Sequence, residues 1–199
     1  MFSNCIKSLI HANQGIIRQK IALLDLLETQ YGPQTCAELF TKTCPIVKAT
    51  IGQHYRHSTD HMELPILMVH SGIQDGEIHY DLRVRGGTLE KDIGEARKRL
   101  ISIQEILKDI DVQHPKEHEQ KKNLTDHEKV DTYFMLSGDT NLECKLQSTL
   151  GRELGFAAHH AIHHMAMVKI IAIQTLGVKE IDLPADFGMA PSTVNYFHQ

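Results

Sequence analysis

Hydrophobic residues recur at helical spacing along much of the chain, and polar or glycine-containing stretches separate the segments. From residue 5 to 31, isoleucines and leucines return every three or four positions, and Gly32 ends the segment. A second such segment begins at Pro45, because proline is favoured in the first turn of a helix. Pro65 inside it predicts a kink or an early end near Leu64, since proline lacks the N–H of a helical hydrogen bond.

The second half of the chain predicts two more helices with a β-hairpin between them. One helix covers about residues 89–110, and Thr88 is its expected N-cap. Residues 129–136 and 142–146 have strand-like composition and flank the turn sequence SGDTN, which predicts the hairpin. The last helix runs to about residue 176, with Ser148 or Thr149 as its expected N-cap and Gly177 at its C-terminus. Residues 36–43 are expected to form a short connection with room for a helical turn, residues 76–88 loop or short extended structure, and residues 180–199 ordered coil.

Long helices joined by short irregular segments indicate an all-α fold. We expect a four-helix bundle with a small β-hairpin and irregular loops. The length of 199 residues fits one domain, residues 1–199. Because the last helix is hydrophobic on nearly all sides, we expect it at the centre of the bundle or at the interface of a homodimer.

Composition and charge exclude several classes of function. The formal net charge of −4 gives no basic field for nucleic acid. No uncharged hydrophobic stretch is long enough to span a membrane, and the N-terminal residues do not resemble a signal peptide. The four cysteines are scattered without a CxxC pair, which indicates reduced thiols rather than disulfides or a zinc ribbon. We therefore expect a cytoplasmic protein.

The sequence HHAIHH places four histidines in the hydrophobic last helix. Residues four apart share one face of a helix, so His159 pairs with His163, and His160 pairs with His164. Either pair can direct two imidazoles at one point, as in helices that bind zinc through two histidines. One helix supplies only two ligands, so a metal site needs a third ligand from elsewhere.

The second helix offers that third ligand in GQHYRHSTDHM. His54, His57 and His61 follow one another at spacings of three and four residues and can lie on one side of the helix. Three neutral imidazoles suit zinc, nickel or a similar divalent ion. The alternative is that these histidines bond to one another and to backbone groups inside the bundle. The histidine pattern therefore leaves open a metal site and a metal-free histidine core.

Four stretches resemble the DinB/YfiT-like superfamily, and together they cover most of the chain. TIGQHYRHSTDH resembles its second helix, and HAIHHMAMV resembles its fourth, in which a histidine recurs four residues later. IHYDLRVRGGTLEKD and DFGMAPSTVNY resemble the middle loop and the tail of an uncharacterised bacterial branch. The resemblance implies a four-helix bundle that holds a divalent metal, zinc or nickel, between its helices.

Carried over residue by residue, the resemblance implies the metal ligands His57, His160 and His164. The pair His159 and His163 is the alternative register. The residues after His164 depart from the commoner pattern of the superfamily. The resemblance therefore does not extend to the residues that surround the ligands there or to a substrate contact. Some relatives are thiol-dependent transferases or isomerases, which makes a small-molecule thiol a candidate co-substrate.

Other residues near the expected ligands have candidate roles. His54 and His163 are candidates to orient a ligand imidazole, or to be alternative ligands. His61 and Asp60 are further alternatives, and with His54 they are the candidate general bases. We expect a metal-dependent thiol transferase or hydrolase. The alternatives are a non-catalytic bundle with a structural metal that serves dimerisation or partner binding, and a pH-responsive histidine core without metal.

Overall fold

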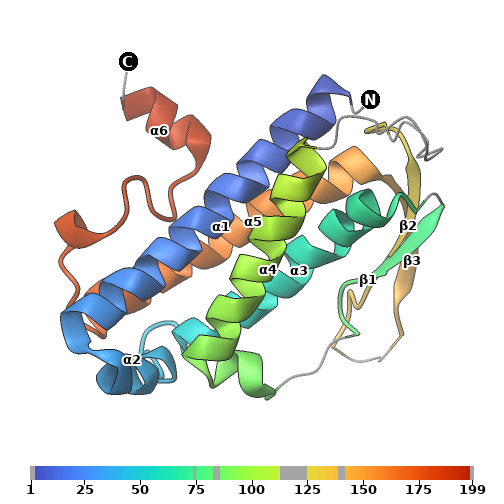
Figure 1. Ribbon diagram of the computed structural model, residues 1–199. Helices are drawn as coiled ribbons and strands as arrows, with labels where there is room; N and C mark the ends of the chain where they lie inside the picture. The colour runs from blue at the N-terminus through green and yellow to red at the C-terminus, as the bar shows by residue number, and fades with distance from the viewer. Residues whose placement is uncertain (1–2, 74, 83–85, 113–124, 139–141, 198–199) are drawn as a thin grey trace.

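The computed structural model describes residues 3–73, 75–82, 86–112, 125–138 and 142–197. These residues form a mostly helical structure with one small sheet (Figure 1). The α-helices are α1 (Asn4–Tyr31), α2 (Pro33–Phe40), α3 (Ile51–Ser71), α4 (Ile93–Val112), α5 (Leu150–Gln174) and α6 (Pro191–Phe197). The 3-10 helices are η1 (Thr88–Glu90) and η2 (Glu180–Asp182), and the strands are β1 (Gly76–His79), β2 (Lys129–Phe134) and β3 (Cys144–Thr149).

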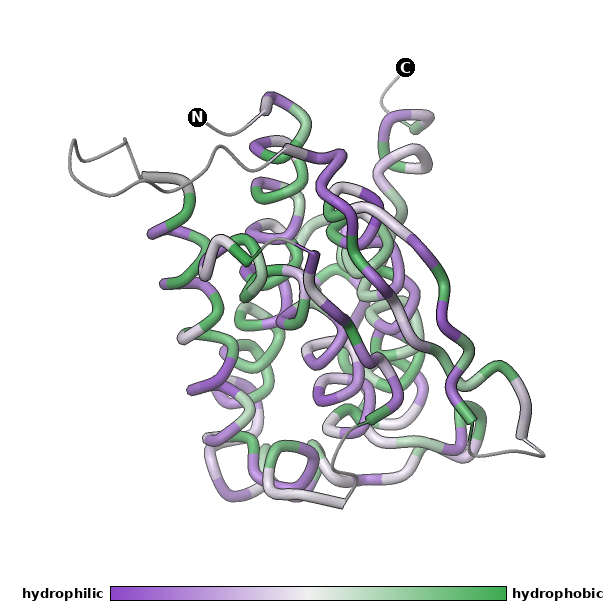
Figure 2. Tube along the Cα trace, turned by 90° about the vertical axis from the view of Figure 1, so that its right-hand side faces the viewer, coloured by the Kyte–Doolittle hydropathy of each residue, from purple (hydrophilic) through white to green (hydrophobic). Residues whose placement is uncertain are grey.

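The long helices α1, α3, α4 and α5 pack side by side around one hydrophobic core. Helix α3 contacts α4 and α5, and α1 contacts the same two helices from the other side. Hydrophobic and hydrophilic residues alternate along these helices, as expected when each helix buries one side (Figure 2). The described residues therefore share one hydrophobic core, in which α3 and α5 are in direct contact.

Helix α3 differs from its prediction at both ends. It begins at Ile51 instead of Pro45, because Thr50 caps it and exchanges hydrogen bonds with Gln53 in a capping box. It does not end near Leu64 but continues through Pro65 to Ser71. Proline removes only the one hydrogen bond that its own N–H would donate, and the buried hydrophobic face of α3 continues on both sides of it.

The predicted antiparallel strand pair is confirmed, and it belongs to a three-stranded sheet, while residues 139–141 of the predicted turn lie outside the described residues. Strands β2 and β3 pair antiparallel, with Phe134 opposite Cys144. Strand β1, expected as loop or short extended structure, pairs parallel to β2 on its other side, with Gly76 opposite Val130. The all-α expectation therefore needs this correction. The sheet lies at the end of the helical layer where α3 ends and α5 begins (Figure 1).

The ends of the other helices follow local signals. Helix α5 starts where predicted, because the Thr149 side chain accepts a hydrogen bond from the Arg152 backbone N–H. Helix α4 starts at Ile93 instead of about residue 89, because Asp92 accepts from the first turn while residues 88–90 form η1. The tail was expected as coil but contains η2 and α6. No helix in the described part of the chain is long and hydrophobic enough to cross a membrane.

Gly52 permits a close contact between α3 and η1. A Cβ atom at this position would overlap the Glu90 carbonyl oxygen and would lie 2.8 Å from a ring carbon of Phe40. The carbonyl oxygen belongs to the backbone and cannot move aside as a flexible side chain can. The absence of a side chain at Gly52 therefore sets how closely η1 approaches the start of α3.

Candidate metal centre

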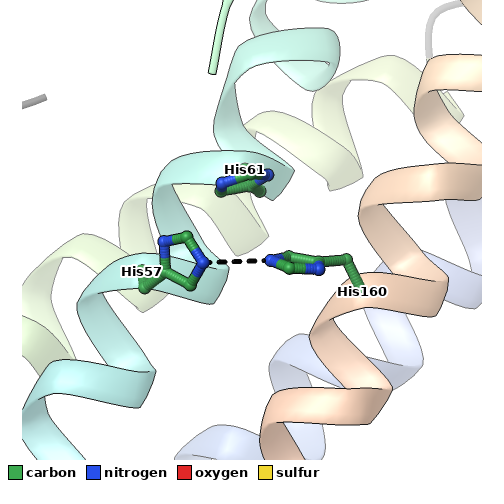
Figure 3. Close-up of side chains that lie close together, drawn as sticks. All are labelled: His57, His61 and His160. Atoms are coloured by element: carbon green, nitrogen blue, oxygen red, sulfur yellow. Dashed lines mark hydrogen bonds between the residues drawn. The ribbon is translucent and has the colours of Figure 1, made fainter. Parts of the chain in front are cut away.

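Five histidine side chains gather where α3 faces α5. His54, His57 and His61 come from α3, and His160 and His164 come from α5. His57 and His61 lie four residues apart, as do His160 and His164, so each pair shares a helix face. In Figure 3, the rings of His57 and His61 meet the ring of His160 in the space between the two helices.

The nitrogen atoms of these rings lie at distances that suit a metal site. His160 Nε2 lies 3.1 Å from His57 Nε2 and 3.1 Å from His164 Nε2. One ligand atom each from His57, His61 and His160 lie within 4.8 Å of one another. Two nitrogens bound to one tetrahedral ion at the usual bond length lie about 3.4 Å apart. His57, His61 and His160 therefore form a group that could hold a metal ion, although the structure does not identify the metal.

His54 contacts the far side of this cluster. Its Nδ1 lies 2.7 Å from Nδ1 of His164, the nitrogen opposite the one that faces His160. If His164 Nε2 gave its lone pair to an ion, its Nδ1 would carry the proton and donate it to His54. This position is the one expected for a residue that orients a ligand imidazole.

Loss of solvent disfavours the charged form of two histidines in the cluster. Loss of solvent lowers the pKa of His164 to about 2, and the neighbouring His57 and His160 contribute smaller shifts in the same direction. Loss of solvent, reinforced by His163, lowers the pKa of His54 to about 4. Metal ions bind the neutral imidazole, so these two side chains need lose no proton to bind an ion near pH 7.

Aromatic side chains cover the cluster on the side of the sheet. The Tyr80 ring stacks on the His61 ring with centroids 4.8 Å apart and an interplanar angle of 19°. Phe156 stacks on His160 at 5.6 Å, and Phe134 stacks on Tyr80 at 4.9 Å. The parallel pairing of β1 with β2 positions Tyr80 directly after β1. Sequence periodicity gave no signal for this pairing.

The Tyr80 hydroxyl is anchored by a buried carboxylate. It donates to Glu153 Oε2 at 2.6 Å, and Glu153 also accepts from the Ser148 hydroxyl and from Arg152 at 2.8 Å. Loss of solvent and the negative charge of Glu153 raise the pKa of Tyr80, so the tyrosine stays protonated. The sheet and α5 are thus joined beside His61.

A buried lysine on α1 donates hydrogen bonds to the part of α3 that carries His57. Lys20 Nζ donates to Ser58 Oγ at 2.9 Å, to Thr59 Oγ1 at 2.5 Å and to the Tyr55 carbonyl at 3.2 Å. Burial lowers the pKa of Lys20 to about 7, while Asp60 opposes that shift. Sequence reasoning missed this residue, although a lysine within the hydrophobic stripe of the first helix was a signal.

Other predicted site residues lie outside the cluster. His159 and His163 are exposed on α5, and the His163 ring borders the cluster with its centroid 5.4 Å from that of His164. Asp60 forms ion pairs with Arg56 at 3.3 Å and with Arg99 at 2.9 Å. Of the expected ligands, the structure brings His57, His160 and His164 together and adds His61. Their role as ligands stays a prediction.

Comparisons with known proteins give little further information. No protein-family model matches the chain. No solved structure matches it. A curated relative from Rhizopus delemar, named FK506-binding protein 5, is 34% identical over 123 residues. The match covers 60% of this chain and 27% of that protein, so the chain aligns with about a quarter of its relative.

Proposed function

We propose that this chain is a DinB-like four-helix-bundle protein that binds one divalent transition-metal ion between α3 and α5. The observation that carries the proposal is the pair of 3.1 Å distances from His160 Nε2 to His57 Nε2 and to His164 Nε2. An imidazole nitrogen has either one proton or one lone pair in the ring plane, so it cannot form a linear hydrogen bond with both neighbours. A cation between the rings attracts all three lone pairs.

The donor set favours zinc or nickel. Neutral imidazoles suit both ions, and the described residues of the cluster contain no carboxylate that would favour magnesium or calcium. When bound, such an ion would supply Lewis acidity toward a thiol or a water molecule. The resemblance to the DinB/YfiT-like superfamily supports a small-molecule thiol as the co-substrate.

The carboxylates near the cluster favour thiol transfer over hydrolysis. Asp60 is held by Arg56 and Arg99, and Glu153 is held by Tyr80, Ser148 and Arg152. Neither carboxylate is available as a general base for water, whereas a thiol ionises more readily and has less need of one.

Metal analysis tests the proposal directly. Protein purified without a nickel column would be analysed by mass spectrometry, alongside His57→Ala and the double variant His160→Ala/His164→Ala. We expect about one zinc or nickel ion per chain in the wild type and none in the two variants. The matched control is His159→Ala/His163→Ala, which removes the exposed pair of α5 and should keep the ion. No bound metal after incubation with zinc and nickel would contradict the proposal.

A second candidate function is that of a non-catalytic protein in which a structural metal ion supports the formation of a homodimer. The observation that favours it is the stacking of Tyr80 on His61 and of Phe156 on His160, which covers these two rings on one face. Under this hypothesis, chelation lowers the melting temperature and changes the mass measured by analytical ultracentrifugation. Metal-dependent turnover of a thiol such as glutathione, lost in His57→Ala, would exclude it.

A further inference from the structure

We infer that His61 is a fourth ligand of the ion, so that the site consists of two histidine pairs, one from each helix. This inference rests on the proposed function, because it adds a ligand to the same site. The superfamily resemblance implies three ligands, His57, His160 and His164. His61 is an additional donor that the structure positions beside them, and it changes what the site can do.

The position of His61 supports its role as a ligand. Its side chain is almost completely buried, with 5% of the residue exposed. Its ring centroid lies 4.5 Å from that of His57 and 4.4 Å from that of His160. One of its nitrogens is within 4.8 Å of the ligand atoms of both residues. In a tetrahedral set the nitrogens lie roughly 3.4 Å apart, so ion binding would have to bring the His61 nitrogen that close to those of His57, His160 and His164.

The stacking of Tyr80 on the His61 ring does not occupy the His61 nitrogens. Tyr80 covers a face of the His61 ring, since the two planes differ by only 19°. Imidazole lone pairs and N–H bonds lie in the ring plane, so face stacking does not occupy them. The hydrogen bond from Tyr80 to buried Glu153 fixes the tyrosine and thereby holds His61 in place.

A fourth imidazole determines how the ion meets other molecules. Zinc sites with four protein ligands are closed, whereas catalytic sites keep one position open. With His57, His61, His160 and His164 all bound, a thiol or another small ligand reaches the ion only by displacing one of them. His61 is the candidate for displacement, because the two 3.1 Å contacts of the cluster join His160 to His57 and to His164. The site is therefore closed at rest, and His61 controls its opening.

Cobalt substitution tests this inference. Cobalt(II) would be added to metal-free wild type and to His61→Phe, which keeps a ring to stack on Tyr80 but removes both nitrogens. Visible absorption would be recorded with and without azide, a small anion that binds an open coordination position. His163→Phe is the matched control, because it replaces an exposed histidine of α5. X-ray absorption of the wild-type cobalt protein would count the bound imidazoles without any substitution.

We expect a tetrahedral cobalt spectrum that azide does not change in the wild type and in His163→Phe. In His61→Phe, the spectrum should shift and respond to azide, or folded protein should bind no cobalt. Identical azide-sensitive spectra in wild type and His61→Phe would overturn the inference, as would three imidazoles by X-ray absorption. If the wild type binds no cobalt, zinc or nickel, the proposed function itself fails. If His61→Phe does not fold, the number of imidazoles counted by X-ray absorption in the wild-type cobalt protein decides whether the inference holds.

Discussion

The buried amine of Lys20 predicts that stability rises with pH above neutrality. Its pKa is lowered by burial from 10.5 to about 7 in the folded protein. Between these two values the unfolded chain binds a proton that the folded protein has lost, so the free energy of unfolding increases with pH. One pKa unit corresponds to roughly 1.4 kcal/mol, so the full increase between pH 7 and pH 10.5 is about 4–5 kcal/mol. Below pH 7 both states are protonated and the dependence ends.

The variant Lys20→Met tests this magnitude, because methionine has similar length and no titratable group. Urea unfolding would be followed by circular dichroism at pH 7, 8, 9 and 10 for both proteins, without metal. We expect the free energy of unfolding of the wild type to rise relative to that of Lys20→Met by about 3–4 kcal/mol over this interval. Tyrosine and cysteine titrations are common to both proteins and cancel in the difference.

Parallel pH profiles for the two proteins would refute the reasoning, because they would show that Lys20 stays protonated in the folded state.

The variant Lys20→Met also affects the site. Without Lys20, the hydroxyls of Ser58 and Thr59 lose their donor, beside His57. We expect Lys20→Met to bind zinc more weakly while keeping one ion per chain.

Three further predictions concern stability. Gly52→Ala should destabilise the protein by about 1–3 kcal/mol in urea unfolding, because its Cβ would overlap the backbone of η1; unchanged stability would contradict this close packing. Tyr80→Phe should lose about 1–3 kcal/mol by removing a donor to buried Glu153, whereas Tyr133→Phe, which removes an exposed hydrogen bond, should lose less; equal losses would contradict the role of burial. Zinc at about 100 times its Kd should stabilise the wild type by roughly 2.7 kcal/mol in thermal unfolding and leave His57→Ala unaffected; equal stabilisation of both would place the ion elsewhere.

Local sequence signals predicted much of the helical structure. Gly32 ends α1 and Thr149 caps α5, and both were expected from residue type and position. Pro45 was misleading because the stronger capping box at Thr50 lies five residues later. Strand β1 was not identified as part of the sheet, because its partner β2 follows only after α4, and pairing across such a distance leaves no periodic pattern in either segment.

In the candidate site, as in the fold, features within one helix could be predicted from the sequence, whereas contacts between distant segments could not. The spacing of His160 and His164 is a property of one helix, so their common face could be predicted. Their meeting with His57 depends on the packing of α3 against α5, which the resemblance suggested and the helix pattern did not. The positions of His61 beside the group and of Tyr80 on its ring depend on packing and on the sheet. Spacing placed His61 on the same face of the helix as His57, but neither of these contacts could be derived from it.

The distance along the chain between the histidine pairs has a consequence for the unfolded state. His57 and His160 are 103 residues apart in sequence, yet their Nε2 atoms lie 3.1 Å apart. An ion that joins them would act as a cross-link around a loop of about 100 residues, for which the chain-entropy model of disulfides gives roughly 4.7 kcal/mol. Unlike a disulfide, this cross-link would respond to the free metal concentration and not to thiol oxidation. The free metal concentration would then determine how strongly this cross-link stabilises the folded chain against unfolding.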